Sequence, residues 1–495
     1  MLKFGWFETD ITPKQKIALE GEFFERITDE VETPITVTAL AIEADGEQVV
    51  FCSCDLVHIT EELVENVRDR IQSLDIDKSK VVLSCVHIHN SYTYRTKGPL
   101  KVECSQDVDI IKKYMPDDCE YIHEVESNEA MDPDTAFDFL ADAIARTVDA
   151  AWENRAVGGY AAGFGRAAVG MNRRVCYTDG TAKMWGDVDK ATFTALEGGN
   201  DSGIEMLFIY DENKKMTGIV ANIACPAQVM EQRSVISSDY WGKVKILLRE
   251  KYGKDIMLLP ICAAAGDQCP RDLVRWVEPE TPIKDPNVIR NEPKFRRADP
   301  SMFDVKGTWK IGRRIFNEIE MAIDEIDSIK QDAEFKHSTK NLSLPLRRVS
   351  DAEKTASESR MREFLKGRKT LNYVDSAEMF VHAGTIQRYE IQEYCNTVEC
   401  EIHAIKLGDI VFVTNPFELF LDYGNQIRAR SAASQTFIAQ LTNGILEYLP
   451  TKKAQEAGHY SAYVSSGYVG YEGGEILVSA TLDMINDLFE WGKNE

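Results

Sequence analysis

Several features that would place the chain in a familiar class are missing from its sequence. No run of about 18 apolar residues, the length that a membrane-spanning helix needs, occurs anywhere. Residues 1–6 contain no apolar stretch long enough for a signal peptide. Positive charge is scarce, because 57 Lys and Arg face 81 Asp and Glu and leave a formal charge of −24. Such a charge repels phosphate backbones and anionic lipids, so we expect neither a nucleic acid nor a membrane as a partner.

The eleven cysteines show no spacing typical of a disulfide framework. Their number is odd, and Cys52, Cys54, Cys85 and Cys262 lie within apolar runs, where reduced core thiols are common. We therefore expect a soluble, cytoplasmic protein. The sequence is compatible with a homo-oligomer and does not specify one.

The 495 residues, 44% of them hydrophobic, are enough to bury a large core. Residues 36–57 predict a β-hairpin that turns at Asp45-Gly46, and a helix with Thr60 as its N-cap follows, with Leu63, Val67, Ile71 and Leu74 on one face. A strand over residues 81–87 comes next. The order of hairpin, helix and strand returns between residues 402 and 441, which is consistent with an internal duplication.

We expect an α/β fold in which mixed β-sheets are flanked by helices. Further helices are predicted over residues 137–151, between Ser238 and Gly253, and over residues 477–488. Residues 92–134 and 275–302 are rich in charge and lack periodicity, so they are interpreted as inserted loops. No domain boundary is visible, and residues 1–495 are taken as one catalytic domain.

The most informative stretch is Ser84 to Asn90, which contains His87 and His89. Alternate residues of a strand point to the same side, so the two imidazoles are expected to project together from the end of a buried strand. A metal site fits this arrangement, although an isolated pair of this kind is more often two hydrogen-bonded core histidines.

A second informative stretch, residues 266–272, follows the apolar run at residues 258–265. Loops that follow buried strands often contain catalytic or ligand-binding residues. Asp267 is interpreted either as a turn cap or as a group that orients His89, and Cys269 either as a nucleophile or as part of a pocket wall. Arg173 is suited to bind a substrate carboxylate or hydroxyl, and an exposed arginine is its structural alternative.

Seven short motifs occur in an order that resembles the N-terminal catalytic domain of the neutral/alkaline, non-lysosomal ceramidase family, in a bacterial-type form without the C-terminal domain. They are Asp10-Ile11-Thr12-Pro13, Asp45-Gly46, His87-Ile88-His89, Asn172-Arg173, Gly266-Asp267-Gln268-Cys269-Pro270, Pro416-Phe417-Glu418 and Tyr448-Leu449-Pro450-Thr451. The resemblance runs from about residue 5 to residue 485. It implies a zinc amidase that cleaves an N-acyl bond with a metal-activated water.

The resemblance also implies roles for individual residues. By position in the motifs, His87, Glu418 and Tyr448 correspond to zinc ligands, and His89 corresponds to a histidine that assists the chemistry beside the metal. Cys269 stands where the family has an active-site serine. Arg173 corresponds to an arginine that faces the substrate, and Tyr460 to a tyrosine that helps to stabilise the oxyanion.

At one position, the residue that the family uses as a zinc ligand differs in this chain. Where the family has a histidine before proline, this chain has Cys225-Pro226. A thiolate is an acceptable zinc ligand, so Cys225 is taken as the replacement, although a cysteine in an apolar strand is more often a packing residue. Gln228 and Glu231 are alternative ligands from the following loop. Zn²⁺ is the expected cofactor, and another divalent metal remains open.

We therefore predict a metal-dependent hydrolase that cleaves an amide or related bond of a small polar molecule. Ceramide itself is not expected, because the family's members with that activity are secreted or membrane-facing and carry a further immunoglobulin-like domain. Arg173, Gln268 and Arg271 would suit a sugar or a carboxylated substrate, so a carbohydrate-active hydrolase or lyase on the same scaffold is an alternative. A non-catalytic binding protein that has lost its metal is another.

Overall fold

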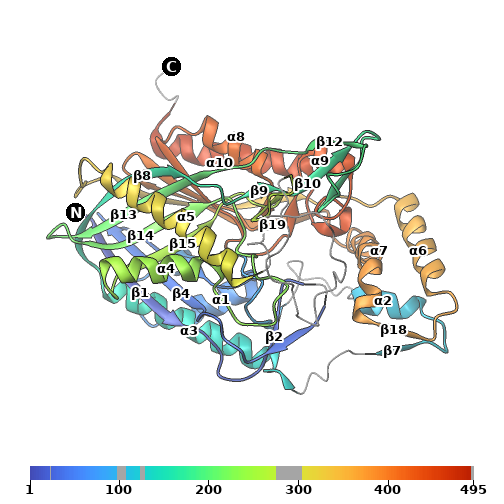
Figure 1. Cartoon of the computed structure of the whole chain (residues 1–495). Coiled ribbons are helices and arrows are strands. Elements are labelled where there is room, and N and C mark those ends of the chain that lie inside the picture. Colours follow the sequence, from blue (N-terminus) through green and yellow to red (C-terminus); the bar gives the residue numbers. More distant parts are fainter. Residues whose placement is uncertain (23, 97–106, 123–128, 275–303, 492–495) are drawn as a thin grey trace.

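Two mixed β-sheets packed face to face form the centre of the structure, a computed structural model that describes residues 1–22, 24–96, 107–122, 129–274 and 304–491 (Figure 1). The large sheet has eight strands, in the order β15 (Met257–Cys262), β14 (Met216–Ile223), β13 (Gly203–Asp211), β8 (Ala156–Arg166), β1 (Lys3–Asp10), β4 (Thr36–Ala44), β5 (Glu47–Cys54), β6 (Val81–Cys85). The small sheet has four strands, in the order β17 (Phe335–Pro345), β19 (Thr397–Leu407), β20 (Ile410–Thr414), β22 (Gln435–Ala439). This arrangement confirms the predicted mixed α/β class.

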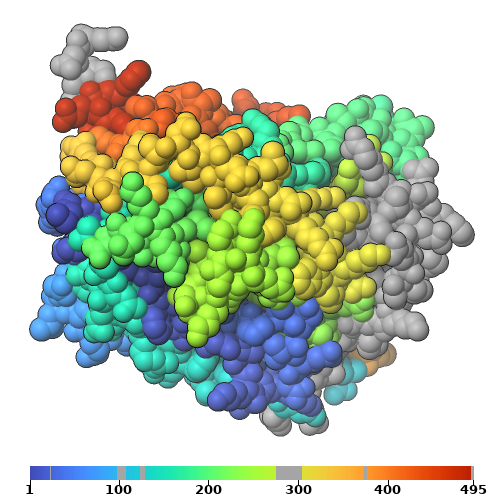
Figure 2. Space-filling view, turned by 60° about the vertical axis from the view of Figure 1, so that its left-hand side comes forward, coloured from blue at the N-terminus to red at the C-terminus, as the bar shows by residue number. Residues whose placement is uncertain are grey.

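Apolar side chains fill the space between the sheets, and helices cover both outer faces. Phe51, Phe412 and Phe437 belong to the core cluster between the two sheets. The outer face of the large sheet packs against α1 (Glu61–Arg70), α3 (Pro133–Glu153), α4 (Asp239–Tyr252) and α5 (Val305–Asp324). Helices α8 (Leu421–Arg430) and α10 (Tyr471–Phe489) cover the small sheet. Figure 2 shows α4 and α5 side by side on the surface.

One topological unit occurs three times in the chain. An antiparallel hairpin is followed by a helix and by a strand that pairs in parallel with the second hairpin strand, as in β4-β5-α1-β6. The same order is found in β13-β14-α4-β15 and in β19-β20-α8-β22. The sequence indicated the first and third units only. The sequence did not predict the middle unit, because the turn between β13 and β14 lacks an Asp-Gly pair like the one between β4 and β5.

Most local predictions are confirmed. The hairpin turns at Asp45 and Gly46, both with positive φ (53° and 89°), as a tight hairpin requires. The Thr60 side chain accepts a hydrogen bond from the backbone of Leu63 at the start of α1, and α4 lies between Ser238 and Gly253. The predicted first helix was too long, because α1 ends at Arg70 and Leu74 is fully exposed.

A smaller group of elements has a core of its own beside the sandwich. It comprises α2 (Asp107–Tyr114), β7 (Glu120–Ile122), α6 (Asp351–Leu365), β18 (Thr370–Asn372) and α7 (Tyr373–Ile391), at the right of Figure 1. Part of the insertion predicted at residues 92–134 therefore forms regular structure, while the one at 275–302 lies outside the described residues. No helix in the described ranges combines the length and apolar composition that crossing a bilayer requires.

Candidate metal centre

The side chains singled out in the sequence gather where the strands of the three units end. Hydrogen bonds tie these ends together: the Gln440 N–H donates to Cys262 O (3.1 Å) and the Asn443 N–H to Leu83 O (2.9 Å). Ligands of α/β proteins commonly bind at the carboxyl ends of parallel strands. His87 and His89 follow β6, and Cys225 and Glu231 follow β14. Residues 267–271 follow β15, Glu418 follows β20, and Tyr448 follows β22.

His87 occupies a strained position directly after β6. The strand ends at Cys85, and His87 has a φ of +58°, in the left-handed region that residues with a Cβ rarely adopt. The expectation that His87 and His89 extend a strand is therefore wrong. Their rings still lie close together, with centroids 4.8 Å apart in an edge-to-face arrangement. Backbone strain of this kind is concentrated at functional sites.

Glu418 and Tyr448 are brought together by strand pairing. They lie opposite each other in the short parallel pair of β21 (Glu418–Leu419) and β23 (Tyr448–Leu449), and their side chains are hydrogen-bonded. His87 Nδ1 donates to Val57 O (2.8 Å), which leaves the lone pair on Nε2, 3.4 Å from Glu418 Oε2. Two acceptors at this distance require a proton or a cation between them.

Burial controls the protonation of His87 and Glu418. It lowers the pKa of His87 to about 4, so the imidazole is neutral at pH 7. Burial also raises the pKa of Glu418 to about 7, against the opposing effects of Arg173 and of the hydrogen bond from Tyr448. A neutral imidazole and a carboxylate that ionises near neutrality are the forms that bind a divalent cation.

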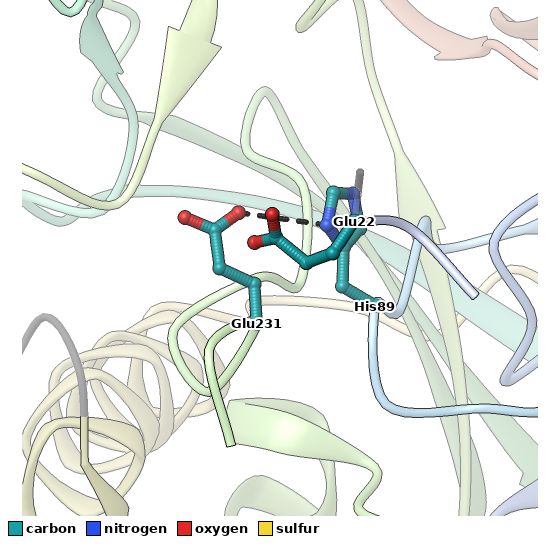
Figure 3. Close-up of side chains that lie close together, drawn as sticks. All are labelled: Glu22, His89 and Glu231. Carbon is teal, nitrogen blue, oxygen red and sulfur yellow. Dashed lines mark ion pairs between the residues drawn. The ribbon is translucent and has the colours of Figure 1, made fainter. Parts of the chain in front are cut away.

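A second cluster, formed by Glu22, His89 and Glu231, lies beside the first. Across the described part of the chain, it is the one group of at least three His, Cys, Asp or Glu side chains whose donor atoms all lie within 4.8 Å of one another (Figure 3). His89 Nδ1 is 3.5 Å from Glu231 Oε2. The cluster has donors and spacing that could hold a metal ion. The sequence suggested Glu231 only as an alternative ligand and did not indicate Glu22.

Cys225, expected to replace the missing histidine ligand, is packed in the core. The residue is fully buried, and its Sγ lies 3.5 Å from Pro226 O and 3.8 Å from Val169 O. Burial raises the pKa of the thiol well above its usual value. These contacts favour a packing role, and metal binding by Cys225 stays a prediction.

Arg173 is a buried cation at the site. It is 4% exposed, and its Nη2 donates to Gly266 O (3.0 Å) and to Tyr448 Oη (3.2 Å). It forms no ion pair with any residue that the structure describes. Trp185 lies between Arg173 and Arg271, with its ring centroid 5.8 Å and 4.5 Å from their Cζ atoms. Arg173 is therefore a buried positive charge with hydrogen-bonding capacity at the site, and its binding to a substrate stays a prediction.

The other predicted substrate-binding residues are engaged within the protein. Arg271 forms an ion pair with Glu231. Gln268 Nε2 donates to Gly199 O (3.1 Å), whereas Gln268 Oε1 is buried and has no hydrogen-bond partner within the described residues. An unused buried acceptor is costly, so Gln268 Oε1 is a second polar group that a ligand can satisfy.

Asp267 holds two segments in place. Its carboxylate accepts hydrogen bonds from Asn172 Nδ2 (2.8 Å) and from the Leu421 N–H (2.9 Å) at the start of α8. One bond comes from a side chain and the other from the backbone, and neither involves His89. Of the two roles that the sequence left open for Asp267, the contacts favour the structural one.

Cys269 and Tyr460 lie close to Arg271 and Tyr448 respectively. Burial raises the pKa of the Cys269 thiol to about 12, which keeps it protonated at pH 7 and disfavours a nucleophilic role. The Tyr460 hydroxyl is hydrogen-bonded to Tyr448, and the two rings meet edge to face with centroids 5.5 Å apart. Tyr460 therefore lies beside Tyr448, and its role as an oxyanion donor stays a prediction.

The overall fold is that of solved ceramidase structures. The neutral ceramidase from Pseudomonas aeruginosa superimposes with a TM-score of 0.66 and 15% sequence identity, over 99% of this chain and 75% of that chain. A ceramidase complexed with C2 gives a TM-score of 0.64 and 14% identity over the same shares. No protein-family model matches the sequence, and no curated protein does. The resemblance expected from the seven motifs is thus confirmed for the fold.

Proposed function

We propose that the protein is a metal-dependent hydrolase that cleaves an amide or related bond of a small polar substrate. The main observation in support of this proposal is that His87 Nε2 and Glu418 Oε2 face each other 3.4 Å apart. Tyr448 is hydrogen-bonded to the same carboxylate. The pair lies at strand ends of a fold shared with ceramidases, which are hydrolases.

The donor set fits zinc. Bonds of about 2.0–2.1 Å around a tetrahedral zinc ion place two ligand atoms about 3.3 Å apart, close to the 3.4 Å between His87 and Glu418. His87, Glu418 and Tyr448 would hold the ion, and all three are less than 10% exposed. When bound, zinc would lower the pKa of a water molecule to about 7 and polarise a carbonyl group.

The protein's own groups orient the substrate. Arg173 Nε is buried without a hydrogen-bond partner within the described residues, so it can donate to a substrate oxygen. Tyr460, whose pKa burial raises, keeps its proton and can donate to an oxyanion. Gln268 Oε1 can accept from a substrate hydroxyl or amide. These polar, enclosed groups support a small polar substrate rather than a long apolar one. The role of His89 in proton transfer stays a prediction.

The test is metal content combined with metal-dependent hydrolysis. Protein purified without chelator or immobilised-metal resin should contain at least one zinc per chain by elemental analysis. It should hydrolyse members of a panel of N-acyl amino acids and N-acetylated sugars, lose this activity when zinc is stripped, and regain it when zinc is returned. His382→Ala, which removes a half-buried histidine on α7, is the matched control and should keep its metal. Hydrolysis by metal-free protein would exclude the proposed mechanism.

A further inference from the structure

The cluster of Glu22, His89 and Glu231 has a buried histidine whose ring nitrogens are unused. His89 is 9% exposed, and neither of its ring nitrogens has a hydrogen-bond partner among the described residues. Its Nδ1 lies 3.5 Å from Glu231 Oε2, and a Glu22 carboxylate oxygen completes a set of three donors within 4.8 Å (Figure 3). Cis ligands at bonds of about 2.1 Å lie about 3 Å apart and trans ligands about 4.2 Å apart, so small side-chain shifts would bring three donors that lie within 4.8 Å of one another onto one metal ion.

A single buried arginine ties the three ligand-bearing segments together. Arg26, 1% exposed, donates from Nη2 to Glu20 O (2.7 Å) and His89 O (2.7 Å), and from Nη1 to Glu231 O (2.6 Å). These carbonyls belong to Glu231, to His89 and to a residue two positions before Glu22. The three segments are far apart in the sequence, and one guanidinium fixes their relative positions.

Two further contacts orient the side chains of His89 and Glu231. Gly21 has a φ of +104°, and a Cβ there would lie 2.5 Å from the His89 ring, so only glycine lets the segment before Glu22 pass over the imidazole. Arg271 binds Glu231 Oε1 and leaves Oε2 directed at His89. Outer contacts that hold a ligand carboxylate in this way are typical of built metal sites.

We propose that Glu22, His89 and Glu231 bind a second divalent cation, next to the one assigned to His87, Glu418 and Tyr448. The inference rests on the proposed function, because it makes the centre of that hydrolase a two-metal centre. One imidazole and two carboxylates form a donor set that suits Zn²⁺ or Mn²⁺. Coordination through His89 Nδ1 would leave the proton on Nε2, so with this second ion bound His89 would donate a hydrogen bond, and this role would replace the proton-transfer role predicted from the sequence.

The test is the number of Zn²⁺ ions bound per chain. Chelator-stripped protein is loaded with Zn²⁺, passed through gel filtration and analysed for metal; the variants are Glu22→Gln, His89→Asn, His87→Asn and Glu30→Gln. Glu30 is an exposed carboxylate on the same segment as Glu22 and serves as the matched control. We expect two ions in the wild type and in Glu30→Gln, and one ion in each of the other three variants. Circular dichroism identifies a variant that has not folded, and the near-isosteric Glu22→Gln keeps the test valid if His89→Asn does not fold.

Two other results would overturn the proposal in different ways. One ion in the wild type that is lost in His87→Asn but kept in Glu22→Gln would remove the second site and leave the proposed function intact. One ion that is lost in Glu22→Gln but kept in His87→Asn would show that the cluster around His89 is the sole site. That result would also overturn the ligand set of the proposed function.

Discussion

The part of the chain that the structure describes contains two pairs of buried histidines with their rings in contact, and the pairs differ in how their ring nitrogens are hydrogen-bonded. His337 and His403, with ring centroids 5.1 Å apart, form a closed chain. His337 Nδ1 contacts Gln48 O (3.0 Å), His337 Nε2 contacts His403 Nδ1 (2.9 Å), and His403 Nε2 contacts Glu401 Oε1 (2.8 Å). This pair bridges the small sheet to the large one and has no nitrogen left for a ligand.

His87 and His89 are also buried, but their ring nitrogens are not all used in hydrogen bonds. Both nitrogens of His89 lack a hydrogen-bond partner among the described residues, and the Nε2 lone pair of His87 faces a carboxylate. The comparison indicates that burial alone does not distinguish a structural histidine from a candidate metal ligand. The separating feature is whether neighbouring groups already use the ring nitrogens.

Removing His87 should have the largest effect on metal binding. We expect His87→Ala to weaken zinc affinity at the proposed His87 site by more than about 100-fold. This is a larger loss than is typical when only an outer-shell contact is removed. His337→Ala should leave zinc affinity unchanged, because that ring has no free lone pair. Competition titration with a zinc-selective dye measures both. Equal losses in the two variants would remove the distinction between the pairs.

Removing His403 should affect stability instead. We expect His403→Ala to lower the free energy of unfolding by about 2 kcal/mol, because the variant leaves the buried His337 ring and one oxygen of the partly buried Glu401 carboxylate without their partner. Urea denaturation followed by tryptophan fluorescence provides the measurement. Zinc content should remain at the wild-type level, and a loss of zinc in this variant would show that the closed pair is coupled to the metal centre.

The closed pair should also make the protein sensitive to acid. Burial, with a contribution from His403, lowers the pKa of His337 to about 3, while the unfolded chain has a histidine pKa of about 6.5. The unfolded state therefore binds a proton first, and stability falls as the pH drops below 6.5, by about 1 kcal/mol between pH 6.5 and 5.5. The slope should be smaller in His337→Asn than in the wild type. Superimposable pH profiles of unfolding free energy would contradict this assignment.

Cys225 should give the smallest effect. Because its Sγ contacts backbone oxygens in the core, Cys225→Ser should leave zinc affinity within about threefold of the wild type and lower stability by about 1 kcal/mol. A loss of affinity of tenfold or more would show that the thiol is a ligand after all, as the family resemblance implied. The same dye titration decides between the two.

Local signals in the sequence predicted the parts of the fold that depend on neighbouring residues. The Asp45-Gly46 turn and the Thr60 cap were found because turn and cap chemistry lies within a few residues. The extension of the first helix to Leu74 failed, since apolar periodicity does not show where a helix stops being covered by the core. The packing of two sheets face to face depends on contacts distant in sequence, so periodicity alone did not define it.

The site was predictable only in part, for a related reason. His87, Glu418 and Tyr448 could be named because each belongs to a short motif with a fixed order along the chain. Glu22 could not be named, because its place beside His89 depends on Gly21 and on the Arg26 bonds to distant carbonyls. The left-handed backbone at His87 could not be predicted either, because positive φ is uncommon even for histidine, although histidine adopts it more often than most residues.

Under the proposed ligand assignment, the three repeated units also set the order in which a newly made chain could acquire a metal ion. His87 belongs to the first unit, Glu231 follows β14 of the second, and Glu418 and Tyr448 follow strands of the third. Chains fold from the N-terminus as they are synthesised, so a nascent chain that ends before β20 has neither Glu418 nor Tyr448. Under the proposed ligand assignment, metal retention at the His87 site would then begin only when the third unit docks, and bound zinc would serve as a marker of completed assembly. Chains that fail at this last step would be poor in metal and exposed to proteolysis.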